Sequence, residues 1–179
     1  MTNEEIQKLV RSWFPLQNPP EPVAEAADDV EEKKAPIKVK EPIDFTEEGS
    51  QFLNILVAPE LMHDLMQKLK DDPATKFDLL FCLTGMDWGK ELGVVYHLES
   101  TTHRHIVVVK VQTADRENPN FDTVSDLWPT ANFHEREVFD FFGINFNNHP
   151  NMKYLFLTED WEGYPLRKDY EDEKNMIIY

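Results

Sequence analysis

The chain has 179 residues, 41% of them hydrophobic, and its 34 acidic against 18 basic residues give a formal net charge of −16. A surface this acidic repels phosphate backbones and anionic lipid head groups, so we expect no nucleic-acid partner and no direct lipid binding. No apolar run approaches the roughly 20 residues of a membrane-spanning helix. We therefore expect no direct membrane insertion, and any membrane association to come through other proteins.

Cysteine usage narrows the chemistry further. Cys82 is the only cysteine, so the chain forms no intrachain disulfide and cannot supply the several thiolates of an iron–sulfur cluster. It stands between Phe81 and Leu83 in an apolar run without a nearby basic residue. This setting is typical of an inert thiol in a protein core.

The first 44 residues divide into two predicted segments. Residues 1–14 are interpreted as a short helix that Thr2 or Asn3 caps, because apolar side chains recur on one face. Residues 15–44 contain six prolines and no aromatic residue, and acids alternate with bases. Such a segment buries too little apolar surface to offset the entropy of ordering it, so we interpret it as an acidic, proline-rich linker.

Residues 45–143 have a globular composition and form the predicted core domain. The alternating apolar residues of the last strand predict burial on both of its faces. The fold class predicted is α+β: a mostly antiparallel sheet with flanking helices and an extended C-terminal arm. The elements expected before the final helix are a strand at 52–57, a helix from Pro59 to Asp71, a strand at 77–83 with a turn at 84–89, and a hairpin of strands at 92–98 and 104–113.

The segment 125–143 predicts a further helix, with Pro129 near its start and Gly143 just past its end. Aromatic side chains fall almost all round this helix, which is typical of a helix that is contacted from more than one side. Glu135 lies on an aromatic side of it. Because an unpaired buried carboxylate is costly, we expect a cation from elsewhere in the fold or from another chain to face Glu135.

Residues 144–179 carry seven aromatic residues without a sustained helical or strand period. This composition differs from that of disordered segments and is typical of an extended arm that docks on another surface. We favour docking on a partner protein over docking on the arm's own domain.

Motifs for catalysis and metal binding are absent. There is no G-x-S-x-G, no P-loop and no H-E-x-x-H, since His134-Glu135 is not followed by a second histidine one turn later. Glu135 and Glu137 stand two positions apart on the predicted helix and point to different sides, which is unsuitable for a shared substrate. We expect no catalytic residue, no metal site and no bound cofactor in this chain.

Two sequence blocks carry a family resemblance. The helix contains the core E-R-E-x-x-D, followed by two phenylalanines and Gly-Ile, and the arm contains His149-Pro150 and the block W-E-G-x-P-L-R-K-D at 161–169. With these motifs at this spacing, residues 50–170 resemble the 30-kilodalton subunit family of respiratory complex I, which is the C-type subunit of NADH-quinone oxidoreductase. Residues 15–44 look like an insertion relative to that family.

The resemblance implies a non-catalytic subunit in the peripheral arm of a proton-translocating NADH-quinone oxidoreductase, on the cytoplasmic side of the bacterial inner membrane. It implies chiefly one partner, the large quinone-site subunit of the 49-kilodalton type, which this chain would scaffold. FMN, iron–sulfur clusters and quinone would be bound by partner subunits. The residues expected at a partner interface or in a structural network are Glu135, Arg136, Glu137, Asp140, His149, Trp161, Arg167, Lys168 and Asp169.

We also expect a specific network within this set. The hypothesis is that Glu135, Arg136 and Asp140 form a charged network with Arg167 or Lys168, which fixes the direction in which the arm leaves the domain. The sequence alone is also compatible with two other functions. One is the equivalent subunit of a membrane-bound hydrogenase or another complex I-like dehydrogenase, and the other is a free-standing soluble enzyme.

Overall fold

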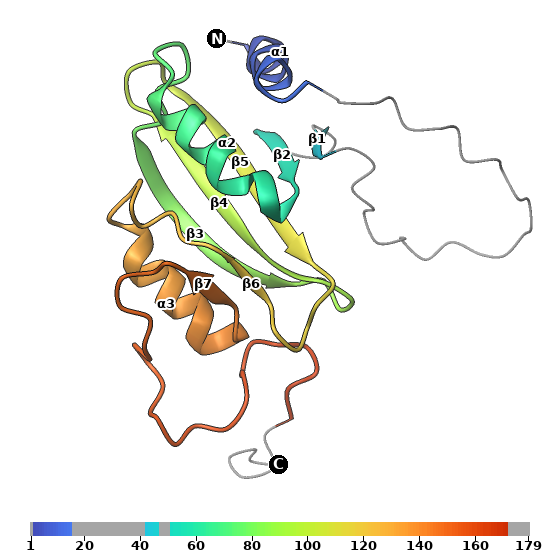
Figure 1. Cartoon of the computed structure of the whole chain (residues 1–179), viewed down its shortest axis with the longest axis vertical. Coiled ribbons are helices and arrows are strands. Elements are labelled where there is room, and N and C mark those ends of the chain that lie inside the picture. Colours follow the sequence, from blue (N-terminus) through green and yellow to red (C-terminus); the bar gives the residue numbers. More distant parts are fainter. Residues whose placement is uncertain (1, 16–41, 47–50, 172–179) are drawn as a thin grey trace, which may run out of the picture.

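The computed structural model describes residues 2–15, 42–46 and 51–171, and the predicted linker over 15–44 lies largely outside them (Figure 1). Along the described residues the order of elements is α-β-β-α-β-β-β-β-α-β. The elements are α1 Asn3–Trp13, β1 Ile43–Thr46, β2 Leu53–Val57, α2 Pro59–Asp71, β3 Leu79–Asp87, β4 Leu92–Ser100, β5 His105–Thr113, β6 Asn120–Asp122, α3 Ala131–Phe142 and β7 Asn145–Asn147.

Five strands form the main sheet in the order β1-β2-β5-β4-β3. Neighbouring strands are antiparallel except β2 and β5, which pair in parallel. The predicted class, α+β with a mostly antiparallel sheet, is therefore confirmed. The register aligns Ile55, Val109, Tyr96 and Leu83 across the four strands β2, β5, β4 and β3. All four side chains belong to one buried apolar cluster, so this row marks the inner face of the sheet.

The helices pack on this inner face. Figure 1 shows α2 lying across the front of β4 and β5, with α3 below it against β3. Apolar side chains of α1, such as Ile6 and Val10, and of α2, such as Leu65, belong to the same buried cluster as the inner-face strand residues. The stripe predicted for the first helix thus points into the core, and a capping box between Thr2 and Glu5 starts that helix.

No described helix contributes to the opposite face of the sheet. Val108 on that face is also buried, at 4% exposure, as the alternation in its strand predicted. Phe81 and Met86 on β3 remain exposed. Cys82 is half-buried and pairs in register with His97, whose row is outside the core cluster. The prediction that Cys82 is a core thiol is therefore wrong.

Strand β3 is longer than the sequence suggested. The turn expected at 84–89 begins only after Asp87, where the Trp88 N–H bonds to the Glu91 carbonyl at 2.9 Å. Gly85, which the sequence pattern placed in the turn, pairs with Val94 within the strand. A Cβ at Gly85 would lie 2.4 Å from the Phe142 ring, so this glycine lets α3 approach the strand.

Other differences arise from pairing between distant segments. Ile43 and Asp44, placed in the linker by the sequence, belong to β1 and pair with β2. Strands β6 and β7 form a separate two-stranded parallel sheet that local patterns did not reveal. Helix α3 starts at Ala131 rather than at Pro129. It ends as predicted at Gly143, whose φ of 65° suits a glycine.

The contact between Gly85 and α3 predicts a steric penalty. Gly85→Ala forces its new methyl group against the Phe142 ring, so we expect the free energy of unfolding to fall by about 1–3 kcal/mol. Chemical denaturation of the two chains measures the difference. Thr84→Ala is the matched control, because Thr84 is the exposed neighbour on the same strand. Equal stability of the Gly85→Ala and wild-type chains would contradict this packing.

Candidate functional site

Helix α3 buries three charged side chains. Glu135 and Asp140 are 0% exposed and Arg136 is 7% exposed, whereas Glu137 on the same helix is exposed. Burying a charge without hydrogen-bond partners costs several kcal/mol, so each of these side chains needs partners. The partners show which parts of the chain the helix holds in place.

Asp140 holds the backbone of the arm. Its Oδ2 accepts hydrogen bonds from three consecutive backbone N–H groups, those of Leu155 at 2.9 Å, Phe156 at 2.6 Å and Leu157 at 3.2 Å. Bonds from neutral donors to a carboxylate are charge-assisted and stronger than bonds between neutral groups. One side chain therefore fixes the direction of three residues of the arm.

Arg136 holds the carbonyl groups that immediately precede these amides. Its Nε donates to the Lys153 carbonyl at 3.0 Å and its Nη2 to the Tyr154 carbonyl at 2.9 Å. Arg136 and Asp140 lie one helical turn apart, on one side of α3. The cation thus binds the C=O groups and the anion binds the N–H groups of the same stretch, residues 153–157, which we call the strapped segment.

Glu135 faces a different part of the chain. Its Oε1 accepts from the Val124 N–H at 2.8 Å and its Oε2 from the Thr123 hydroxyl at 2.5 Å. Burial raises the pKa of Glu135 to about 7, although these two bonds oppose the rise. The cation that we expected opposite Glu135 is not found among the described residues. The nearest basic group is the His149 Nε2 at 3.8 Å, and burial lowers the pKa of that imidazole.

The block at 161–169 is held by a second set of contacts. Asp87 and Arg116 form an ion pair at 2.8 Å, with the Asp87 side chain 2% exposed. The Lys168 N–H donates to Asp87 Oδ2 at 2.9 Å, and the Asp169 carboxylate lies 3.0 Å from Arg116. Hydrogen bonds from Arg116 hold the pKa of Asp87 well below its usual range.

Arg167 contacts backbone rather than carboxylates. Its Nε donates to the Phe142 carbonyl at 2.6 Å and its Nη1 to the Arg116 carbonyl at 2.9 Å. The predicted network that joined Glu135, Arg136 and Asp140 to Arg167 or Lys168 is therefore wrong. The helical period shows which side chains share one side of α3, but it cannot show that the loops opposite them present peptide groups.

The remaining predicted residues have varied positions. The Trp161 side chain is half-buried, and its indole N–H has no hydrogen-bond partner in the described part of the chain. Glu137, Lys168 and Asp169 are exposed. Arg116, which sequence reasoning missed, lies in the loop between β5 and β6, where no local pattern marks it. Its single signal is that it is a basic residue in a strongly acidic chain.

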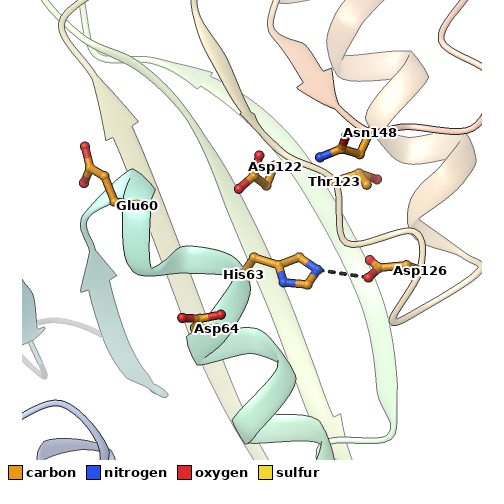
Figure 2. Close-up of a pocket in the computed structure, with 7 residues that line it drawn as sticks. All are labelled: Glu60, His63, Asp64, Asp122, Thr123, Asp126 and Asn148. Atoms are coloured by element: carbon orange, nitrogen blue, oxygen red, sulfur yellow. Dashed lines mark hydrogen bonds and ion pairs between the residues drawn. The ribbon is translucent and has the colours of Figure 1, made fainter.

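An acidic hollow lies beside this region. Figure 2 shows it between α2 and the segments that follow β6 and β7, with His63 paired to Asp126 at 3.0 Å. Thr123 lines the hollow and also donates to Glu135. Within the described ranges, no three His, Cys, Asp or Glu side chains are arranged to hold a metal ion. The residues that line the hollow are Glu60, His63, Asp64, Asp122, Thr123, Asp126 and Asn148.

No helix in the described part of the chain is long and apolar enough to cross a membrane. The strapped segment presents one exposed apolar side chain, that of Phe156. Phe156 is 62% exposed and its ring stacks on Phe141 at 5.7 Å between centroids. The Leu166 N–H bonds to the Phe141 carbonyl, and Leu166 is also exposed. We call Phe141, Phe156 and Leu166 the arm patch.

Comparison with known proteins identifies relatives over most of the chain. Residues 55–175 match the family described as respiratory-chain NADH dehydrogenase, 30 Kd subunit. The C/D-type subunit of NADH-quinone oxidoreductase from Phocaeicola vulgatus is 52% identical over 124 residues, which are 69% of this chain and 24% of that protein. The C-type subunit of the same enzyme from Roseiflexus castenholzii is 46% identical over 120 residues, 65% of this chain and 68% of the relative.

The chain thus spans about a quarter of the length of the C/D-type relative and about two thirds of the length of the separate C-type relative. A solved structure is also similar, that of the membrane-bound sulfane sulfur reductase, an archaeal respiratory membrane complex. The TM-score is 0.66 at 25% identity, and the match covers 94% of this chain and 85% of that chain.

The role of Asp140 leads to a prediction about the arm. Asp140→Asn keeps the shape of the side chain but removes the charge that binds three amides, so the strapped segment is expected to open more often. Limited proteolysis measures this as faster cleavage within 150–160. Glu137→Gln is the matched control, because it removes a charge from an exposed position on the same helix. Equal cleavage rates for all three chains would contradict the assignment.

The Asp87–Arg116 pair predicts a pH-dependent contribution to stability. Because the folded-state pKa of Asp87 is lowered, the contribution is present above the unfolded pKa of about 3.9 and is lost as the pH falls through the folded value. Asp87→Asn is expected to lower the free energy of unfolding at neutral pH by about 2–3 kcal/mol. In acid denaturation, the difference in free energy of unfolding between Asp87→Asn and wild type should become smaller below about pH 4. A difference that is constant with pH would contradict the ion pair.

Proposed function

Because the chain belongs to the 30-kilodalton subunit family of respiratory-chain NADH dehydrogenase, we propose that it is a non-catalytic peripheral subunit of a proton-translocating NADH-quinone oxidoreductase. In this role it supports electron transfer from NADH to quinone by holding the quinone-site subunit in place. The observation that carries the proposal is the strapped segment, which buried charges fix on α3 while its Phe156 side chain stays exposed.

We propose that the main partner is a D-type subunit, the large 49-kilodalton type that carries the quinone site. The C/D-type relative supports this, because its name joins the two subunits in one protein. When two subunits are fused in one chain, each is at a high effective concentration near the other. Such a fusion suits subunits that function in contact. The arm patch is the expected contact. An ordered arm loses less conformational entropy on binding than a flexible one, so more of the contact energy becomes affinity.

We further propose that the chain binds no redox group of its own, and that FMN, iron–sulfur clusters and quinone belong to partner subunits. Its single cysteine is too few for a cluster. The strong negative charge favours a peripheral position against proteins rather than against anionic lipid. The position proposed is the cytoplasmic side of the bacterial inner membrane.

A second candidate function rests on the structural neighbour. That chain comes from a sulfane sulfur reductase complex, and its match covers 94% of the present chain. The same fold therefore suits an equivalent subunit of a membrane-bound hydrogenase or of another complex I-like dehydrogenase. Electron-donor assays on the complex purified through a tagged chain separate the candidates. NADH-dependent quinone reduction favours the first, and activity only with another donor favours the second.

The arm patch is the basis of a test of the proposed partnership. Phe156→Ser combined with Leu166→Ser removes exposed apolar side chains, so the fold is expected to be retained while recovery of the D-type subunit falls at least about tenfold. Recovery is measured by mass spectrometry after affinity purification of the tagged chain from its native host. Phe81→Ser is the matched control, since Phe81 is an exposed apolar residue on the far face of the sheet.

Circular dichroism and the thermal midpoint establish that each variant is folded. Two results would contradict the proposal: full recovery of the D-type subunit with the double variant, or the absence of iron–sulfur and membrane subunits from the wild-type preparation. The second result would instead favour a free-standing soluble protein.

A further inference from the structure

Glu135 and His149 form a buried pair at the point where the arm begins. Both side chains are 0% exposed, and Glu135 Oε2 lies 3.8 Å from His149 Nε2. Glu135 belongs to α3, whereas His149 follows β7 and precedes the strapped segment. Contacts between these two residues therefore connect the helix to the first residues of the arm.

The hydrogen bonds of His149 determine which ring nitrogen carries its proton. The backbone N–H of Asn151 donates to Nδ1 at 3.1 Å, so Nδ1 is an acceptor and carries no hydrogen. In the neutral ring the hydrogen is then on Nε2, which lies 3.1 Å from the Asn132 carbonyl. The Nε2–H group thus has the Asn132 carbonyl within hydrogen-bond distance, and the Glu135 carboxyl group lies slightly farther away, at 3.8 Å.

The titratable and charged groups around the pair come from several elements. Tyr96 of β4 has a buried hydroxyl without a hydrogen-bond partner among the described residues, and Asp126 after β6 adds negative charge that raises the pKa of Glu135. Arg136 on α3 donates to carbonyls of the arm and lowers the pKa of His149. In the described ranges no Lys or Arg lies at ion-pair distance from Glu135.

Glu135 is therefore the member of the pair that changes charge near neutral pH. Burial raises its pKa to about 7, whereas burial moves the pKa of His149 below its ordinary value of 6.5. Around pH 7 the imidazole stays neutral while the carboxyl group loses its proton. A carboxylate is a stronger hydrogen-bond acceptor than either a carboxylic acid or a backbone carbonyl.

We propose that Glu135 is a proton-binding site whose ionisation transfers the His149 Nε2–H bond from the Asn132 carbonyl to the Glu135 carboxylate. The proton lost by Glu135 goes to solvent, and the N–H bond of His149 is not broken. To reach the carboxylate, the His149 ring rotates, and this rotation weakens the hydrogen bond from the Asn151 N–H to Nδ1. The turn at 149–151 therefore changes its position. Protonation of one buried group thereby sets how the arm leaves the domain.

Nuclear magnetic resonance of the full chain with 15N-labelled histidine tests this proposal. The His149 ring signals are followed from about pH 5.5 to about pH 8.5, a range that brackets the pKa of Glu135. The expected result is a shift with a midpoint near pH 7, during which one ring nitrogen keeps its hydrogen and the other stays bare. Glu135→Gln is expected to abolish this shift, and Glu137→Gln, its exposed neighbour, to leave it unchanged.

Three results would overturn the proposal. They are the absence of a shift in the wild-type chain, a shift that persists in Glu135→Gln, and a shift in which both ring nitrogens become protonated. Equilibrium unfolding adds a second readout. Because the folded-state pKa of Glu135 is raised from 4.5 to about 7, wild type should lose stability as the pH rises through this range. The loss should be smaller in Glu135→Gln, and equal losses would also contradict the assignment.

Discussion

A guanidinium and a carboxylate, buried one helical turn apart, oblige the fold to place complementary groups opposite them. Here those groups are peptide carbonyls for Arg136 and peptide N–H groups for Asp140, all within five consecutive residues of the arm. Because Arg136 and Asp140 bind backbone groups, their hydrogen bonds fix the path of the arm without using its side chains. Phe156 consequently points to solvent although its own N–H is bound to the helix.

This arrangement changes how the arm relates to a partner. Its aromatic composition suggested a segment that finds its contacts on another protein, yet residues 153–157 and 166–168 have contacts on their own domain. Docking on a partner stays a prediction, but it no longer has to supply the order of the arm. A surface that is organised before binding loses less entropy in the complex, which suits a subunit whose proposed role is to hold a larger subunit in place.

The sequence predicted elements whose signals are local and missed those that depend on distant pairing. Pro59 and Gly143 marked the start of one helix and the end of another, and the hairpin of β4 and β5 follows from its two valine-rich runs. Strands β6 and β7 have three residues each and pair with each other across a gap in the sequence, so no local period reveals them. Gly85 resembled a turn residue, but it is a packing contact with Phe142.

In the candidate site, too, the sequence predicted local features and missed contacts between distant segments. The helical period placed Glu135 on an aromatic side of the helix, and Glu135 is buried, as are Arg136 and Asp140. Their partners were wrong because hydrogen bonds to peptide groups depend on the course of loops. Thr123 and Val124, which bind Glu135, carry no sequence signal, and Arg116 beside Asp87 carries only its basic charge.

Amide hydrogen exchange of the full chain alone, without partners, tests the central claim most directly. If Arg136 and Asp140 fix the strapped segment, the amides of Leu155, Phe156 and Leu157 exchange more slowly than those of an unstructured peptide by about tenfold or more. Exchange of these three amides at unstructured rates, in a chain whose central strands remain protected, would show that the arm becomes ordered only against another protein.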